Sequence, residues 1–472
     1  MNKKMIFLAS FLLFLYVAFT LIMLDKIYKG NPVYLLLYIV SFLPFYTIFQ
    51  VIIFNAYENI FIVSLIKYSK DFVLISSFIL YIIGTRESFF NRNFKFSILD
   101  KLIVSFLCLV LVYLFLPLGE ATFISKVIYS KNIFLIGIVY FFGRNTDFKT
   151  YNWNTILKIL IGLTVFSFLV ALSENTLGNH LHSFLGFSEY NLIVNDIDPH
   201  GNYGLNWSFE SQSTSPRYAA FFADPLEFSA SLILFFTVSI WFLLHSKFRK
   251  NKFYYLLLML IIVGSFLLAI SRASIFSAIL VLILALYISK KYKTMIYGSL
   301  FILLIFIYLY FFSEEETRYL IEDTLSFQNT SSLGHLVEWI EGLLSIYENP
   351  FGIGLAMSGN ASGVDQSIKI GGENQFLIYG VQMGVFSILL YIIILFKSIR
   401  NSIRVYIKSS SLSKKSIGFI TGLTKFGLLI PLFTANAELY LFVALFSWYL
   451  VGQVESLHNS FDLNNKLKIE KG

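Results

Sequence analysis

Long apolar runs restrict what this chain can fold into more than any other feature. A helix needs about 20 apolar residues to cross the hydrocarbon core of a bilayer. Lipid satisfies no backbone polar groups, so helices are the expected spanning elements. The sequence therefore predicts an all-α, polytopic membrane protein. Thirteen candidate runs, some of them short, lie near residues 5–24, 32–54, 71–84, 101–118, 127–142, 155–173, 219–244, 253–270, 273–290, 295–312, 375–396, 417–434 and 438–454.

Composition excludes the other classes of protein. Apolar residues make up 57% of the chain and charged residues 14%, whereas an ordinary globular protein has about 25% charged residues. So few charges could not cover a soluble protein of this size, and disordered chains are poor in apolar residues. Cys108 is the only cysteine, which excludes an intramolecular disulfide.

The net charge of +8 does not indicate nucleic-acid binding. The cations fall in short runs between apolar segments, which is the pattern of the positive-inside rule. These basic connections are expected to face the cytoplasm, and they lie at 86–101, 247–252, 290–293 and 397–415. The predicted partner of the chain is therefore the lipid bilayer, with no nucleic acid.

Two long connections have the opposite character. Residues 175–216 contain no Lys or Arg, and residues 313–373 contain ten acids against only Arg318 and Lys369. Both are expected outside the cytoplasm. We expect twelve crossing helices with both termini cytoplasmic, and an uncleaved first span. This leaves one apolar run too many, so a run near 32–54 or 60–84 is interfacial or re-entrant, or the N-terminus is outside.

The predicted organisation has five parts. N-terminal transmembrane helices (1–174) precede the first long loop (175–216), central helices (217–312), the large loop (313–373), and C-terminal helices with a cytoplasmic tail (374–472). The large loop has apolar and aromatic residues at helical spacing, which predicts a short helix on the membrane face. These residues are Leu336, Ile340, Leu343, Leu344 and Tyr347.

Two arginines stand at the edges of apolar runs, where ionisable residues are rare and usually functional. Arg217 opens the stretch that contains Asp224 and Glu227, at the outer mouth of a span. Arg272 lies in Ser-Arg-Ala between two spans, on the predicted outer face against the positive-inside bias. The alternative reading is structural, with interfacial arginines whose head groups reach water and a helix-capping Asp224.

A third stretch runs from Gly334-His335 and Trp339 to Glu373-Asn374, at the start of an apolar run. It includes Asn349-Pro-Phe-Gly-Ile-Gly354, which indicates a turn. Glu373 is either a functional carboxylate or a charge that complements the helix dipole.

Patterns for metals or nucleotides are weak. His180-x-His182, and His335 with Glu338 and Glu341, have spacings that could bind a cation. Asp196-Ile-Asp198 has the form of a nucleotide-sugar motif, but it falls in a loop predicted to be outside, where nucleotide sugars are not available.

The order of these motifs resembles the Wzy-type O-antigen polymerase and O-antigen ligase superfamily, closely over residues 200–400. The ligases usually have His-Asn where this chain has Glu373-Asn374, which favours a polymerase. Members often have Gly-Arg before the tryptophan, and this chain has Gly334-His335. The matching motifs are R-x6-D-P from Arg217, S-R-A around Arg272, N-P-F-G-I-G from Asn349, and E-N at Glu373.

The resemblance implies a GT-C-like, metal-independent glycosyltransferase of the bacterial cytoplasmic membrane, without a cofactor. It would transfer a glycan from undecaprenyl diphosphate to a lipid-linked repeat unit, for O-antigen, capsule or another exopolysaccharide. A chain-length regulator and a flippase are the implied protein partners. The implied catalytic residues are Arg217 and Arg272, whose forked donors suit a leaving diphosphate, and Glu373 as general base. The implied substrate-binding residues are Asp224, His335, Trp339 and Asn374.

Two alternatives stay open. An O-antigen ligase would differ only in its acceptor. A flippase or transporter for the same lipid-linked glycan would also have many spans, but transporters tend to show internal repeats and broken helices at the midplane. The sequence shows no such repeat, and its charged candidates gather at one predicted face.

Overall fold

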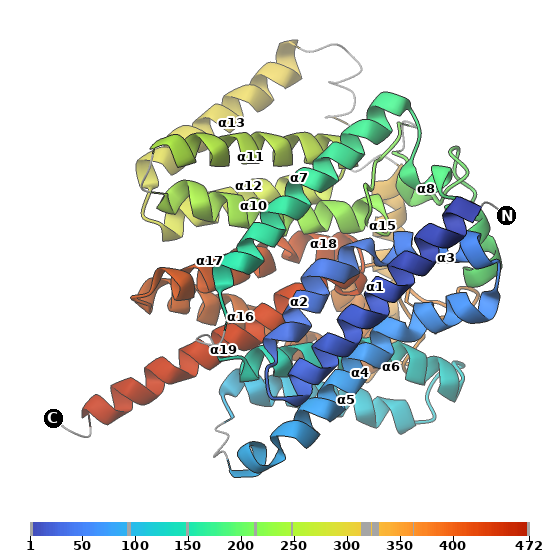
Figure 1. Cartoon of the computed structure of the whole chain (residues 1–472). Coiled ribbons are helices and arrows are strands. Elements are labelled where there is room, and N and C mark those ends of the chain that lie inside the picture. The colour runs from blue at the N-terminus through green and yellow to red at the C-terminus, as the bar shows by residue number, and fades with distance from the viewer. Residues whose placement is uncertain are drawn as a thin grey trace.

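The computed structural model describes residues 3–91, 96–147, 151–211, 215–246, 249–312, 322, 330–361 and 363–469 (Figure 1). Within these ranges the chain forms helices and no β-strand, apart from one isolated bridge between Glu210 and Pro216. The all-α class expected from the sequence is therefore confirmed.

The first half of the chain contains seven long or broken helices and a set of short ones. The broken one is α2–η1–α3, which is interrupted by a 3-10 turn that contains Pro44. The bounds are α1 (Lys3–Tyr28), α2 (Val33–Phe42), η1 (Leu43–Phe45), α3 (Tyr46–Tyr57), α4 (Ile60–Asn91), α5 (Ile98–Phe115), α6 (Phe123–Asn145), α7 (Trp153–Leu177), α8 (Leu181–Phe184), α9 (Phe187–Tyr190), η3 (Asn191–Asn195), η4 (Trp207–Phe209) and α10 (Pro225–His245).

The second half has fewer breaks. Its long helix α16 bends at Gly384, whose φ is 76°. The bounds are α11 (Arg249–Ala269), α12 (Arg272–Ile288), α13 (Tyr292–Phe312), α15 (Thr330–Glu348), α16 (Gln375–Lys408), α17 (Leu412–Gly427), α18 (Leu429–Thr434), η5 (Ala437–Leu439) and α19 (Leu441–Ile469).

Nine segments in the described part of the chain are long and apolar enough to cross a membrane, and two shorter apolar helices accompany them. The chain is thus built as a multi-pass membrane protein. The number of crossings, twelve by the sequence analysis, stays a prediction, as do the five-part division and the orientation of the bundle.

The centre of the bundle is formed by α6, α10, α16, α17 and α19, which pack on one another in several pairs. The contact of α6 with α19 depends on two glycines. A Cβ on Gly143 would lie 1.9 Å from the carbonyl oxygen of Tyr449, and one on Gly452 would lie 2.1 Å from that of Tyr140. Small residues let helix backbones approach closely in this way in membrane proteins.

The long connections gather at one end of the bundle, which we call the loop end. It carries residues 178–224 between α7 and α10, and residues 349–374 between α15 and α16. The opposite end carries the basic connections between α12 and α13 and between α16 and α17. Positive-inside bias therefore places the loop end outside the cytoplasm, as a prediction.

The two termini lie at opposite ends of the bundle (Figure 1). Ser10 near the start of α1 hydrogen-bonds Tyr57 at the end of α3 (2.8 Å), and Lys67 of α4 reaches Asn195 of the loop end (2.8 Å). The start of α1 is therefore at the loop end, whereas α19 runs away from it. Both termini are expected on one side from the sequence, with an N-terminus outside as an alternative, and the positions of α1 and α19 agree with that alternative. The run near 60–84 lies in α4, a continuous 32-residue helix.

The large connection 313–373 contains the expected helix, α15, which covers the five apolar positions named above. Their side chains do not pack into the helical bundle, and their exposed fractions range from 44% for Leu336 to 85% for Tyr347. Residues 313–321, 323–329 and 362 of this connection, and 212–214 of the first one, lie outside the described residues.

Candidate functional site

Arg217 is held against the backbone between α11 and α12. Its Nε and Nη2 both donate to the carbonyl oxygen of Ile270 (3.1 and 2.8 Å), and Tyr218 N donates to Leu268 (3.1 Å). Ile270 has a positive φ of 44°, which turns its carbonyl away from the helical direction. Arg217 is therefore hydrogen-bonded to the backbone directly before the S-R-A motif, although 53 residues separate Arg217 from Ile270.

Arg217 and Arg272 form a pair of cations at the loop end. Burial lowers the pKa of Arg217, Asp224 raises it, and the neighbouring charge of Arg272 lowers it again. Arg272 is the first residue of α12 and is exposed. Two guanidinium groups within electrostatic range of each other favour an anion that can contact both.

Asp224 caps α10. Its Oδ1 accepts from Glu227 N (2.7 Å), and Pro225 follows at the first helical position. Burial raises the pKa of Asp224, while the backbone donors and Arg217 lower it. The structure thus gives Asp224 the capping role that the sequence left as an alternative, next to one of the two arginines.

Asn374 and Trp339 also have structural contacts. Asn374 is the N-cap of α16, and its Oδ1 accepts from Phe376 N (3.0 Å) and Leu377 N (3.3 Å). Trp339 packs edge-on against Phe433 with ring centres 5.9 Å apart. Its indole Nε1 is buried, and no acceptor for it is found among the residues that the structure describes.

Glu373 is connected to both neighbouring segments. Its Oε1 accepts from Asn360 Nδ2 (2.6 Å), and Asn360 Oδ1 accepts from Lys369 Nζ (2.7 Å). Burial raises the pKa of Glu373, and the charge of His335 lowers it. A partly desolvated carboxylate with a raised pKa is the form of a general base that works near neutral pH.

His335 links α15 to this group. Its Nδ1 lies 3.7 Å from Glu338 Oε2. The hydrogen bond with Glu338 raises the pKa of His335, whereas burial and the charge of Arg272 lower it. The sequence-predicted residues Arg217, Arg272, Asp224, His335 and Glu373 therefore belong to one electrostatic group at the loop end.

The N-P-F-G-I-G stretch holds this arrangement in place by docking on α16. Ile353 N and Gly354 N donate to the carbonyls of Val381 (2.8 Å) and Gln382 (3.1 Å), and Val385 N donates to Pro350 (3.0 Å). A Cβ on Gly384 would lie 2.3 Å from the oxygen of Pro350. The motif contains the predicted turn, closed by a hydrogen bond from Gly352 N to the carbonyl of Asn349 (2.8 Å), and this turn packs into the bend of α16.

The candidate cation sites have other surroundings. His180 and His182 are buried among aromatic rings, including that of Phe209, and burial lowers their pKa values to about 4 and about 3. In the described ranges no three His, Cys, Asp or Glu side chains are grouped to hold a metal ion. In the Asp196-Ile-Asp198 motif, Asp198 Oδ2 lies 3.8 Å from His200 Nδ1, and both side chains are exposed.

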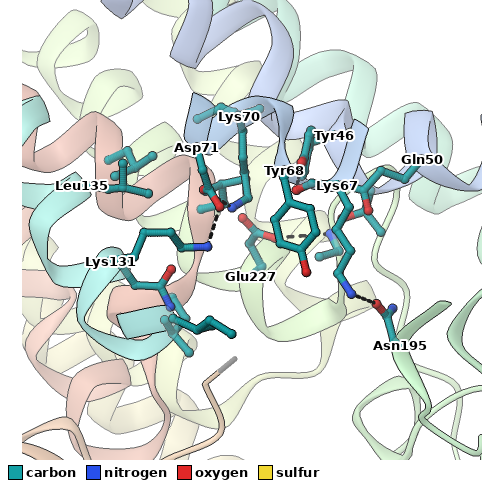
Figure 2. A pocket seen from close by; sticks show the side chains of 18 of the residues that line it. Tyr46, Gln50, Lys67, Tyr68, Lys70, Asp71, Lys131, Leu135, Asn195 and Glu227 are labelled. Atoms are coloured by element: carbon teal, nitrogen blue, oxygen red, sulfur yellow. Dashed lines mark hydrogen bonds and ion pairs between the residues drawn. The ribbon is translucent and has the colours of Figure 1, made fainter. Parts of the chain in front are cut away.

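A cavity of about 530 Å³ lies beside the charged group. Three lysines face it, Lys67 and Lys70 from α4 and Lys131 from α6 (Figure 2). Asp71 is paired with both Lys70 (2.7 Å) and Lys131. Asn360, the donor to Glu373, and Glu227, the residue that Asp224 caps, also line it. The cavity thus continues directly from the candidate site.

Sequence reasoning did not find this cavity. Lys67, Lys70 and Asp71 stand before the apolar run near 71–84, so they are easily assigned to a connection. The signal was nevertheless present, because charges at helical spacing within a membrane helix usually face an interior.

The family models and the curated proteins compared with this chain gave no match. The proposals below therefore depend on the geometry of the site and on the resemblance of its motifs.

Proposed function

We propose that this protein is a polysaccharide polymerase of a bacterial cytoplasmic membrane. It transfers a glycan from undecaprenyl diphosphate to a lipid-linked repeat unit, at the outer face. O-antigen, capsule or another exopolysaccharide would be the product. The observation that carries the proposal is the electrostatic grouping of Arg217, Arg272, His335 and Glu373 at the loop end, next to a polar cavity that is lined by Asn360, the donor to Glu373.

The chemistry of transfer matches these groups. An acceptor hydroxyl attacks the anomeric carbon of the donor glycan, and the bond from that carbon to the diphosphate oxygen breaks. Glu373 takes the hydroxyl proton as the new glycosidic bond forms. The two arginines stabilise the negative charge that develops on the departing diphosphate. His335 favours the ionised, proton-accepting form of Glu373 through its own positive charge.

The other residues position these groups. Asp224 fixes the start of α10 and holds Arg217 electrostatically. Asn374 fixes the start of α16 and therefore the place of Glu373. Trp339 presents an unsatisfied indole N–H near the same face, suited to a sugar hydroxyl. A chain-length regulator and a flippase would be the protein partners of such a polymerase.

The lipid-linked glycan pool tests this proposal against its rivals. Loss of a polymerase accumulates single repeat units on the outer leaflet. Loss of a flippase traps single units on the inner leaflet, and loss of a ligase leaves long polymer on the lipid. The measurement is glycan chain length and leaflet in cells with and without the protein, complemented by the wild-type chain. Unchanged glycans in the deletion strain would reject all three functions.

A further inference from the structure

The cavity beside Glu373 has one strongly cationic wall. Lys70 and Lys131 share the carboxylate of Asp71. Lys67 donates to Asn195 Oδ1 (2.8 Å) and to the carbonyl of Val194 (3.4 Å), and no carboxylate is paired with it among the described residues. It also lies within electrostatic range of Lys70 and Lys131. Three ammonium groups thus lie within electrostatic range of one another, and two of them share the carboxylate of Asp71 (Figure 2).

The two other carboxylates of the lining, Glu227 and Glu438, already accept hydrogen bonds from the protein. Glu438 accepts from Trp448 Nε1 (2.8 Å) and from Tyr391, and it interacts electrostatically with Lys425, which does not line the cavity. Glu227 accepts from the backbone N–H groups of Ala223 (3.3 Å) and Phe442 (3.1 Å). If Asp71 and Glu227 each offset one lysine and the charge of Glu438 is directed to Lys425, the half-buried ammonium of Lys67 has no carboxylate partner in the lining. A singly charged anion beside Lys67 would then be favourable.

The rest of the lining suits a sugar. Aromatic rings from Tyr68, Phe187 and Tyr190 offer apolar faces, and amides from Asn132 and Asn191 offer donors and acceptors for hydroxyl groups. The cavity volume of about 530 Å³ falls within the range of small-molecule sites, about 300–1,000 Å³. It is large enough for a short oligosaccharide.

The position of the cavity connects its occupant to the reaction. Asn360 lines the cavity and donates to Glu373. A sugar held by the lysines would therefore place the hydroxyl groups of a neighbouring sugar towards Glu373, and the diphosphate would lie at Arg217 and Arg272.

We propose that this cavity binds a carboxylate-bearing sugar of the repeat unit, held by Lys67, Lys70 and Lys131, and that the polymer is therefore acidic. The inference rests on the proposed function, because it names the substrate class of that site. A carboxylate fits better than a diphosphate for two reasons. It carries the single charge that the lining lacks, and Lys70 and Lys131 already hold one carboxylate, that of Asp71.

The test compares two forms of one oligosaccharide. The repeat unit of the host's acidic polysaccharide is released from its lipid, and half is reduced at its carboxyl groups to primary alcohols. Binding of each form to the purified full-length protein in detergent is measured by calorimetry. The native form should bind about tenfold more tightly than the reduced form. Equal binding, or no binding of either form, would overturn the proposal.

Lysine variants test whether the preference for the native oligosaccharide arises in the cavity. Lys67→Met should abolish the preference for the native form, since it removes a charge that is not part of an ion pair and leaves no buried acid unpaired. Lys67→Arg should retain the preference. Lys158→Met, at an exposed lysine of α7 away from the cavity, is the matched control. A preference that survives in Lys67→Met and in Lys131→Met would place the carboxylate elsewhere and overturn the proposal.

Further outcomes distinguish a failure of this inference from a failure of the proposed polymerase function. Geranyl diphosphate alone is the probe for diphosphate binding. If it binds in a manner that depends on Lys67, the cavity is a diphosphate site and the proposal fails. If the carboxylate preference is present but deletion of the protein leaves glycan length unchanged, the polymerase function fails and the acidic-sugar site stands. If polymer formation depends on the protein but the polymer is neutral, the polymerase function stands and the acidic-sugar site fails.

Discussion

Arg217 donates two hydrogen bonds to the carbonyl oxygen of Ile270, which lies two residues before Arg272. This contact joins two motifs that are far apart in the sequence. It also gives the two arginines different tasks. Arg217 is anchored to the protein backbone, whereas Arg272 is an exposed side chain at the start of α12. We expect Arg272 to contribute mainly to substrate contact, and Arg217 to both substrate contact and the local fold.

Replacing the arginines should separate these tasks. Arg272→Ala should reduce polymer formation about a hundredfold, equivalent to ~3 kcal/mol of lost transition-state stabilisation, with little change in thermal stability. Arg272→Lys should restore little, since an ammonium lacks the forked donors. Arg217→Ala should also lower the free energy of unfolding by about 1–3 kcal/mol, because the Ile270 carbonyl loses its donors. The measurements are glycan chain length and thermal unfolding of the purified protein.

Arg400→Ala is the control for both arginines, because Arg400 is an exposed arginine of α16 near the opposite end of the bundle. It should leave chain length unchanged. Wild-type chain lengths from Arg272→Ala, at matched protein level, would show that Arg272 takes no part in the reaction.

Glu373 separates the catalytic and structural interpretations most sharply. Glu373→Gln keeps the shape and the contact with Asn360 but cannot accept a proton. The rate of transfer should fall by roughly 10²–10⁴-fold, the usual contribution of general acid–base catalysis. If Glu373 only complements the dipole of α16, the loss is about 0.3–1 kcal/mol of stability and polymer persists. The rate is measured with purified lipid-linked repeat units.

A second variant checks that proton transfer is the reason. Glu373→His introduces another base at the same position, and it should retain some activity where Glu373→Gln retains almost none. Near-normal polymer from Glu373→Gln would remove this residue from the mechanism and direct attention to Asp224 or His335.

The charge of His335 should set the acid limb of the pH–rate profile. Protonated His335 lowers the pKa of Glu373, so the base stays ionised to lower pH. In His335→Asn that charge is lost, and the pKa of Glu373 should rise. The acid limb of kcat/KM should therefore move to higher pH, with less change in rate on the alkaline side, where His335 of the wild type is neutral. A limb that stays in place would show that the two groups are not coupled.

The sequence could predict the helical class and most residues of the charged group, but not the cavity. Arg217, Arg272 and Glu373 stand at the ends of apolar runs, where an ionisable residue is easily recognised from the sequence alone. Lys67 and Lys131 do not, because Lys67 falls in a connection before the run near 71–84 and Lys131 is a single charge within the run near 127–142. Their meaning depends on α4 and α6 packing together, and on residues 191–195 and 360 closing the same cavity. Such non-local contacts cannot be inferred from hydropathy.

The last prediction concerns orientation, on which the outer-face chemistry depends. Single cysteines replace Asp198 and Gln366, two exposed loop-end residues, and Ser411, an exposed residue at the opposite end. All are made in a Cys108→Ser background, because Cys108 is itself exposed. If the basic connections are cytoplasmic, an impermeant thiol reagent should label Asp198→Cys and Gln366→Cys in intact cells or spheroplasts. Ser411→Cys should react only after lysis. The reverse pattern would place the cluster around Glu373 in the cytoplasm, and a polymerase acting on exported lipid-linked glycans would then be excluded.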